Sequence, residues 1–247
     1  MKIACSSSSF ARDITEGALT HLEWLDACAN ELEVDGVVFD LAQFPRTNPE
    51  YLAQLKKHAT DLGLTVAGVY ATGLFTADGG ASLASALALG APLAIGPAAT
   101  ANDDAGAWGD FVAIASARAR EAKRANVTLA VRNVRGTVCA THGDLKRLAK
   151  DVDSSWLRFA FDRAGSNEGT ASEALLAKST IVWHEIAKLE EFAMPTDADA
   201  RAIIERLARF RGFVVLGGET QVTARAAYHA AIERFANLRA RALATAP

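Results

Sequence analysis

Short apolar runs and longer stretches with helical periodicity alternate from one end of the chain to the other. The apolar runs are spaced by about 30 residues, which is the spacing that a right-handed strand-helix repeat requires. Eight such runs are found, and they begin near Lys2, Val34, Leu64, Pro92, Val127, Trp156, Ile181 and Phe213. This pattern predicts eight strands, each followed by a helix.

Between these runs, apolar residues recur at positions i, i+3 and i+4, as they do in helices that pack on one side. Such segments span residues 19–32, 51–63, 110–126, 144–152, 200–210 and 224–242. Strands that alternate with helices are typical of a parallel sheet, and eight repeats favour closure of that sheet. We therefore expect one domain over residues 1–247, folded as a (β/α)₈ TIM barrel of the α/β class.

Composition narrows the range of partners. The formal net charge is −3, and acidic and basic residues are interspersed, so the basic surface of a nucleic-acid-binding protein is not expected. The three cysteines show no spacing typical of a zinc site or disulfide framework. The chain lacks an apolar signal-peptide core and a run of roughly 18 apolar residues. We expect a cytoplasmic protein with no membrane partner.

Candidate site residues follow from the alternation of side chains along each strand. Active sites of TIM barrels lie at the carboxyl-terminal ends of the strands, and inward-facing residues build them. Bulky Leu129 and Val131 suit the helix-facing side, which turns Ala130 and Arg132 inward. The same reasoning predicts that the inner faces of the other strands include Val38, Asp40, Ala160, Asp162, Val182, His184, Ile186, Val215, Gly217 and Glu219.

Five ionisable residues are thus expected to converge at one end of the barrel: Asp40, Arg132, Asp162, His184 and Glu219. His184 is the only histidine at a predicted strand end, so it is a candidate for proton transfer. The remaining histidines fall on predicted helices or loops and are expected at the surface; they are His21, His58, His142 and His229.

Structural roles compete with functional roles for several of these residues. A buried charge needs a partner, so Asp162 is either a site residue or half of a salt bridge with Arg132 or Arg163. Asp40 is either a site residue or a cap for the loop that follows it. Glu219 comes after two glycines and is alternatively a loop residue.

Two polar or glycine-rich segments are candidates for ligand-binding loops. The serine run 6–9 follows the first predicted strand, so its hydroxyls are placed either to bind a polyol or phosphate or to form a solvated loop. Gly79 and Gly80 lack the spacing of a phosphate-binding loop, and they indicate a turn beside a helix.

One segment carries a family resemblance. Residues 127–164, VTLAVRNVRGTVCATHGDLKRLAKDVDSSWLRFAFDRA, resemble the region of xylose-isomerase-like barrels in which strand five reads Glu-Asn-x-x-Gly-Thr and strand six ends in Asp. The segments MKIACSSSSF, VDGVVFDL and LGLTVAGVYA are similar to the corresponding family segments. The resemblance implies a (β/α)₈ barrel and a sugar isomerase or epimerase, although dehydratases and apurinic endonucleases share the same plan.

The resemblance also implies a metal site that this chain has altered. Metal-dependent members hold an ion with a glutamate on strand five, an aspartate on strand six, a histidine on strand six or seven, and a glutamate on strand eight. The matching positions here are Arg132, Asp162, His184 and Gly217, with Glu219 two residues beyond. A guanidinium has no lone pair to donate and repels a cation, so we expect no divalent metal cofactor.

The sequence therefore favours an isomerase- or epimerase-like enzyme whose substrate is sugar-like or anionic, a small polyol or keto acid. The expected catalytic residues are His184, Glu219 and Asp162, and the expected substrate-binding residues are Arg132, Asn133, Asp40 and Arg163. Two alternatives stay open: a non-catalytic binding or accessory protein, and a divalent-metal isomerase or apurinic endonuclease. A homo-oligomer is also expected, with Trp24, Trp108 or Phe44 as interface candidates.

Overall fold

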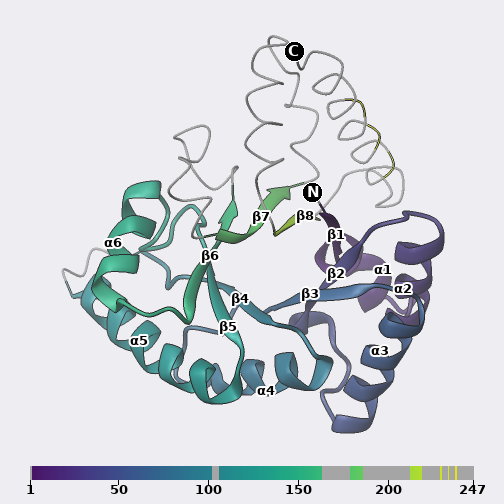
Figure 1. The fold of residues 1–247 in the computed structure, drawn as a ribbon, viewed down its shortest axis with the longest axis horizontal. Helices are drawn as coiled ribbons and strands as arrows, with labels where there is room; N and C mark the ends of the chain where they lie inside the picture. The colour runs from purple at the N-terminus through teal and green to yellow at the C-terminus, as the bar shows by residue number, and fades with distance from the viewer. Residues whose placement is uncertain are drawn as a thin grey trace.

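Eight parallel strands form a closed barrel in chain order (Figure 1). The computed structural model describes residues 2–101, 106–162, 179–185 and 212–218, with the isolated residues 229, 233 and 237. The strands are β1 (Lys2–Ser6), β2 (Gly36–Asp40), β3 (Thr65–Tyr70), β4 (Leu93–Pro97), β5 (Thr128–Arg132), β6 (Leu157–Asp162), β7 (Ser179–Glu185) and β8 (Phe213–Gly217). Each begins within two residues of its predicted start, and β8 pairs with β1, so the TIM barrel is confirmed.

The described helices lie on the outside of the barrel, beside the strands up to β6 (Figure 1). The described ones are α1 (Ala11–Thr15), α2 (His21–Asn30), α3 (Pro49–Asp61), α4 (Gly80–Leu89), α5 (Ala107–Ala125) and α6 (His142–Val152), with 3-10 turns η1 (Ser7–Phe10) and η2 (Leu41–Gln43). Four of the predicted helices are confirmed as α2, α3, α5 and α6. The predicted segments 200–210 and 224–242 lie outside the described residues, apart from the three isolated positions.

Local sequence signals explain where two of these helices begin. Thr20 and Thr141 are N-caps whose hydroxyls accept from the backbone N–H groups of Glu23 and Asp144, while those acidic side chains bond back to the cap. This reciprocal capping box satisfies N–H groups that have no partner within the helix. Helix α6 therefore begins at His142, directly after its N-cap Thr141.

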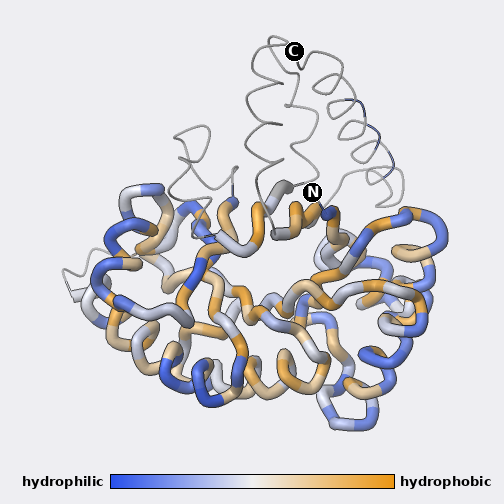
Figure 2. The backbone as a smooth tube through the Cα atoms, viewed as in Figure 1, coloured by the Kyte–Doolittle hydropathy of each residue, from blue (hydrophilic) through white to orange (hydrophobic). Residues whose placement is uncertain are grey.

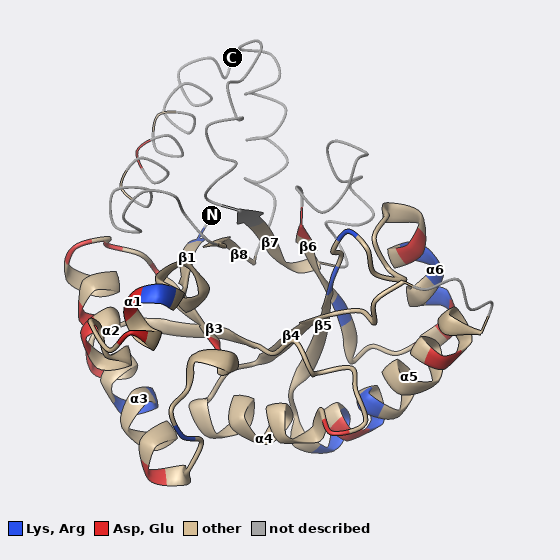
Figure 3. Ribbon diagram, turned by 180° about the vertical axis from the view of Figure 1, so that it is seen from behind, with Lys and Arg blue, Asp and Glu red and all other residues tan. Residues whose placement is uncertain are grey.

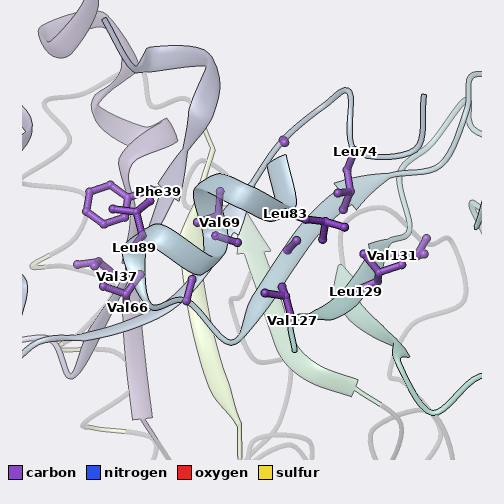
Figure 4. Close-up of a cluster of buried hydrophobic side chains, with 14 of the residues drawn as sticks. Val37, Phe39, Val66, Val69, Leu74, Leu83, Leu89, Val127, Leu129 and Val131 are labelled. Atoms are coloured by element: carbon purple, nitrogen blue, oxygen red, sulfur yellow. The ribbon is translucent and has the colours of Figure 1, made fainter. Parts of the chain in front are cut away.

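Two separate apolar cores fill the barrel and its surround. The larger core lies between strands and helices, and Figure 4 shows part of it, with Val37, Phe39, Leu129 and Val131 among the labelled residues. The smaller core fills the barrel interior and comprises Ala4, Val38, Ala67, Leu93, Ile95, Ala130, Ala160, Ile181, Trp183 and Val215. Because strand side chains alternate, membership of one core or the other reports which way each residue faces.

This division confirms the predicted facing on most strands and corrects it on one. Val38, Ala130, Ala160 and Val215 lie in the interior core as expected. On β7 the prediction is wrong, because Ile181 and Trp183 pack in the interior while Val182 packs in the outer core. Trp183 therefore holds the interior position that the sequence had assigned to its neighbours.

Hydropathy and charge follow the same layering. The strands carry most of the apolar colour in Figure 2, and Figure 3 shows acidic and basic residues mainly on the outer helices, with α4 free of both. Among the described residues, no helix has the length and apolar character needed to cross a membrane.

Several residues expected at the surface are buried. His21 and His142 have little exposed area, and burial lowers the pKa of His21 to about 4. Trp24 is completely buried, so the prediction that it contributes to an oligomer interface is wrong. Trp108 and Phe44 are partly buried, and both pack against the outer core.

Candidate active site

Among the described side chains, four ionisable ones lie at the carboxyl-terminal end of the barrel, and each belongs to the last residue of its strand. They are Asp40 on β2, Tyr70 on β3, Arg132 on β5 and Asp162 on β6. Parallel strands end at the same edge of the sheet, which is the end where barrel enzymes build their active sites. The sequence predicted three of these residues and missed Tyr70.

Arg132 and Asp162 form a salt bridge across the ends of β5 and β6. The Nε and Nη2 groups of Arg132 donate to Oδ2 of Asp162 at 2.9 Å and 2.6 Å. The exposed fractions of the two side chains are 11% and 1%. A buried carboxylate needs such charge-assisted hydrogen bonds, so this pairing compensates the cost of burying the charge of Asp162. The salt bridge that the sequence offered as one alternative is confirmed.

Asn133 holds Asp162 in place through the backbone. The Nδ2 group of Asn133 donates to the carbonyl oxygen of Asp162 at 2.8 Å, and the backbone N–H of Asp162 donates to Oδ1 of Asn133 at 2.7 Å. Asn133 is 0% exposed. The expectation that Asn133 binds substrate does not fit this burial, because its amide is already engaged with the strand-six backbone. The Asn133 side chain instead bonds the backbone of Asp162 in both directions.

Trp183 forms a platform for the guanidinium of Arg132. The Cζ atom of Arg132 lies 4.3 Å from the centroid of the indole, a distance typical of cation–π contacts. Tyr70 approaches the same indole with a centroid separation of 5.7 Å, and Arg132 lies 5.7 Å from the Tyr70 ring. The cation is therefore fixed on one side by a carboxylate and on another by aromatic rings.

Gly217 on β8 leaves room for this indole. A Cβ atom at Gly217 would lie 2.5 Å from Cζ2 and 2.9 Å from Cε2 of Trp183, and 3.1 Å from Cβ of Ser6. Contacts below 3.0 Å force a displacement, and the opposing atoms belong to a buried ring. The indole therefore fills the space into which a strand-eight side chain would project.

These contacts bear on the metal site implied by the family resemblance. At the strand-five position stands a cation, and at the strand-eight position the space is filled by Trp183. The strand-six carboxylate of Asp162 is committed to Arg132. A divalent cation needs anionic or neutral lone-pair donors, so the described residues do not fit such an ion.

Asp40 and Tyr70 are partly buried, as Arg132 is, whereas Asp162 is buried. They are register partners on neighbouring strands β2 and β3. The Oδ1 atom of Asp40 accepts from the backbone N–H of Ala42 at 3.0 Å, so the predicted capping role is confirmed. Its own backbone N–H donates to Oγ of Ser7 at 2.9 Å. These bonds fix the carboxyl group at the strand end without enclosing it.

Burial shifts the acid-base behaviour of both groups. It raises the pKa of Asp40, while the bond from Ala42 and the charge of Arg132 oppose the rise. Burial also raises the pKa of Tyr70; the charge of Arg132 and a hydrogen bond from it oppose that rise, and the charges of Asp40 and Asp162 add to it. Arg132 therefore acts electrostatically on both half-buried groups.

The serine run is part of this end of the barrel and is not a solvated loop. Ser6, Ser7 and Ser9 are buried. Besides the bond from Asp40 to Ser7, the backbone N–H of Gly218 donates to Oγ of Ser8 at 3.2 Å. The hydroxyls therefore link the ends of β1, β2 and β8, and the solvated-loop prediction is wrong.

The other predicted residues are not placed by these observations. Glu219, Arg163 and Ile186 lie outside the described residues. The backbone of His184 belongs to β7, where it pairs with Leu216, but its side chain is not among the described atoms. The roles of these residues stay predictions.

No protein-family model matches the chain, and no curated protein matches it. Solved structures match it along almost their whole length. L-ribulose 3-epimerase aligns with a TM-score of 0.75 at 17% identity, covering 99% of this chain and 98% of that one. A xylose isomerase domain protein from Planctomyces limnophilus aligns at 0.65 and 16%, covering 96% of each chain. The IolI protein, solved with a zinc atom, aligns at 0.71 and 12%, covering 98% and 99%. The chain thus shares the fold of xylose-isomerase-like sugar epimerases and isomerases, as its residues predicted.

Proposed function

We propose that this protein is a sugar isomerase or epimerase that works without a divalent metal on a small polyol-like substrate containing a carbonyl group. The observation that carries the proposal is the guanidinium of Arg132, bonded to Asp162 and stacked on Trp183 at the catalytic end of the barrel. The fold shared with sugar epimerases supports the reaction class. A small sugar-like molecule is accordingly the proposed partner.

A fixed cation supplies what this reaction class needs. Removing a proton from the carbon beside a carbonyl places negative charge on the carbonyl oxygen, and a preorganised positive group stabilises that charge. Arg132 is preorganised because two of its N–H groups and its flat face are already held. No step of this kind needs a metal ligand at position 132 or 217.

The test is exchange of substrate hydrogen with solvent. Ketoses such as L-ribulose, D-tagatose and D-fructose are incubated with the protein in D₂O, and deuterium at the carbon beside the carbonyl is measured by NMR. We expect the wild type to catalyse exchange and Arg132→Ala to lose it by roughly 10²–10³-fold, the effect of removing one oxyanion-stabilising donor. Arg132→Lys retains the charge without the fork, and we expect partial activity.

Arg147 provides a matched control. Its guanidinium also stacks on a tryptophan, 4.2 Å from the Trp108 ring, and also pairs with an aspartate, Asp151, but it lies on α6. Arg147→Ala should exchange deuterium at the wild-type rate. Folded Arg132→Ala protein that exchanges as fast as the wild type contradicts the proposal. Sugar binding by the wild type without any exchange would instead identify a binding protein.

A further inference from the structure

We propose that Asp40 and Tyr70 carry out the proton transfer: the Asp40 carboxylate removes the proton beside the substrate carbonyl, and the Tyr70 hydroxyl donates a hydrogen bond to the carbonyl oxygen. This assignment rests on the proposed function and names the catalytic residues for it. It differs from the residues expected from the sequence, among which Asp162 was catalytic and Asp40 bound substrate.

Accessibility separates these two residues from Asp162, Asn133 and Trp183. A catalytic base must reach the proton that it removes, within about 3 Å. Asp162 and Trp183 are each only 1% exposed, and Asn133 is fully buried. Asp40 and Tyr70 are half buried, and both end their strands on the same side of the barrel. A substrate at this end therefore meets Asp40 and Tyr70 before it meets Asp162.

Hydrogen bonding also argues against Asp162 as the base. One of its oxygens accepts two donors from a guanidinium and the residue is buried, so the carboxylate is already engaged where a substrate would need it. Asn133 further fixes its backbone. Asp162 is thus a positioning residue that holds Arg132 in orientation.

The surroundings of Asp40 and Tyr70 suit proton transfer and hydrogen-bond donation to a substrate. Burial raises the pKa of Asp40, and a base whose pKa approaches the working pH accepts a proton more readily. Tyr70, whose pKa is also raised, stays protonated and can donate its hydrogen. Arg132 lies beside the Tyr70 ring, so its positive charge reaches the oxygen that Tyr70 would bond.

The step balances without a further reactant. The carboxylate of Asp40 takes the proton, the C–H electron pair becomes the carbon–carbon double bond of an enediolate, and the carbonyl π pair moves onto oxygen. That oxygen is stabilised by the Tyr70 hydroxyl and the nearby charge of Arg132. Return of a proton to carbon completes the reaction, and a solvent deuteron taken up by Asp40 in between labels the sugar.

Asp40→Asn and Tyr70→Phe test the assignment in the deuterium-exchange assay. Asparagine preserves the Oδ1 acceptor that caps Ala42, and phenylalanine preserves the ring beside Trp183, so both variants should fold. We expect Asp40→Asn to lower the exchange rate by roughly 10²–10⁴-fold, the usual contribution of general base catalysis. Tyr70→Phe removes one hydrogen-bond donor to the oxyanion and should lower it by roughly 10²–10³-fold.

The controls apply the same substitutions elsewhere. Asp26 on α2 pairs with His58 at 2.9 Å, and the hydroxyl of Tyr51 on α3 is hydrogen-bonded to His21 at 3.0 Å. Asp26→Asn and Tyr51→Phe should exchange at the wild-type rate. If Asp40→Asn exchanges like the wild type while Arg132→Ala does not, this assignment is overturned and the proposed function stands. If the wild type exchanges no ketose, both are overturned.

Discussion

The ends of β5 and β6 and the ends of β2 and β3 both carry charged or polar groups, but they treat them differently. On β5 and β6, Arg132 and Asp162 are paired at 2.6 Å, and the side chain of Asp162 is only 1% exposed. On β2 and β3, Asp40 and Tyr70 are half buried, and burial raises the pKa of each. At the ends of β5 and β6 the two charges neutralise each other. At the ends of β2 and β3 the carboxyl and hydroxyl groups can still be reached by a substrate.

This difference separates residues that orient other groups from residues that can transfer a proton. A buried carboxylate that is paired with a guanidinium contributes orientation, because breaking the pair would leave a buried charge without compensation. A carboxyl group that is partly desolvated but reachable suits proton transfer. The positive charge of Arg132, at the end of β5, therefore acts toward Asp40 and Tyr70 at the ends of β2 and β3.

The largest expected effect on the free energy of unfolding comes from one substitution at the ends of β5 and β6. Asp162→Asn removes the negative charge beside a nearly buried guanidinium. Breaking a buried pair costs roughly 3–5 kcal/mol because the remaining charge has no compensation. Urea unfolding of the variant should show a loss of this size. A loss below about 1 kcal/mol, as for an exposed ion pair, would break the distinction between the two regions.

A medium effect is expected where Trp183 meets β8. Gly217→Ala places a methyl group 2.5 Å from Trp183, and overpacking of this kind costs roughly 1–3 kcal/mol. Thermal unfolding should show the loss, and a second change, Trp183→Phe, should reduce it. Gly109→Ala is the control, because nothing lies within 4 Å of a Cβ atom there. Equal behaviour of the two alanine variants would show that the indole is not tightly packed.

The smallest effect on stability is expected from Asp40→Asn, the same substitution at the end of β2. Because the folded-state pKa of Asp40 is raised, the protein is stabilised below the ordinary aspartate pKa and loses that contribution as pH rises through the folded-state pKa. At neutral pH the asparagine variant should therefore be at least as stable as the wild type, and in acid this advantage should vanish. Urea titrations at both pH values measure it; marked destabilisation at neutral pH would contradict the raised pKa.

The sequence predicted the barrel and three of the four strand-end residues for a clear physical reason. Strand-helix alternation fixes the fold class, and on β5 and β6 bulky residues occupy every second position, so the inward facing of Arg132 and Asp162 could be read directly. On β7 the run of Ile181, Val182 and Trp183 is apolar throughout, so alternation gives no facing, and the interior role of Trp183 was missed.

Tyr70 and the burial of the serine run were missed because both depend on contacts between strands. The register of β3 against β2 shifts at Val37 and Val38, which inserts one extra residue. This bulge lets Ala67 and Tyr70 both face the interior although they are three positions apart. The serine hydroxyls are buried by backbone donors from β2 and from the end of β8, which composition does not reveal.

One measurement tests the central claim, that proton transfer here depends on Arg132 and not on a divalent ion. The protein is treated with a chelator, its metal content is determined by elemental analysis, and deuterium exchange into a ketose is followed with and without added Mn²⁺. The account predicts that metal-free protein exchanges at its original rate and that Mn²⁺ does not increase it. Exchange that disappears on chelation and returns with Mn²⁺ would contradict the account.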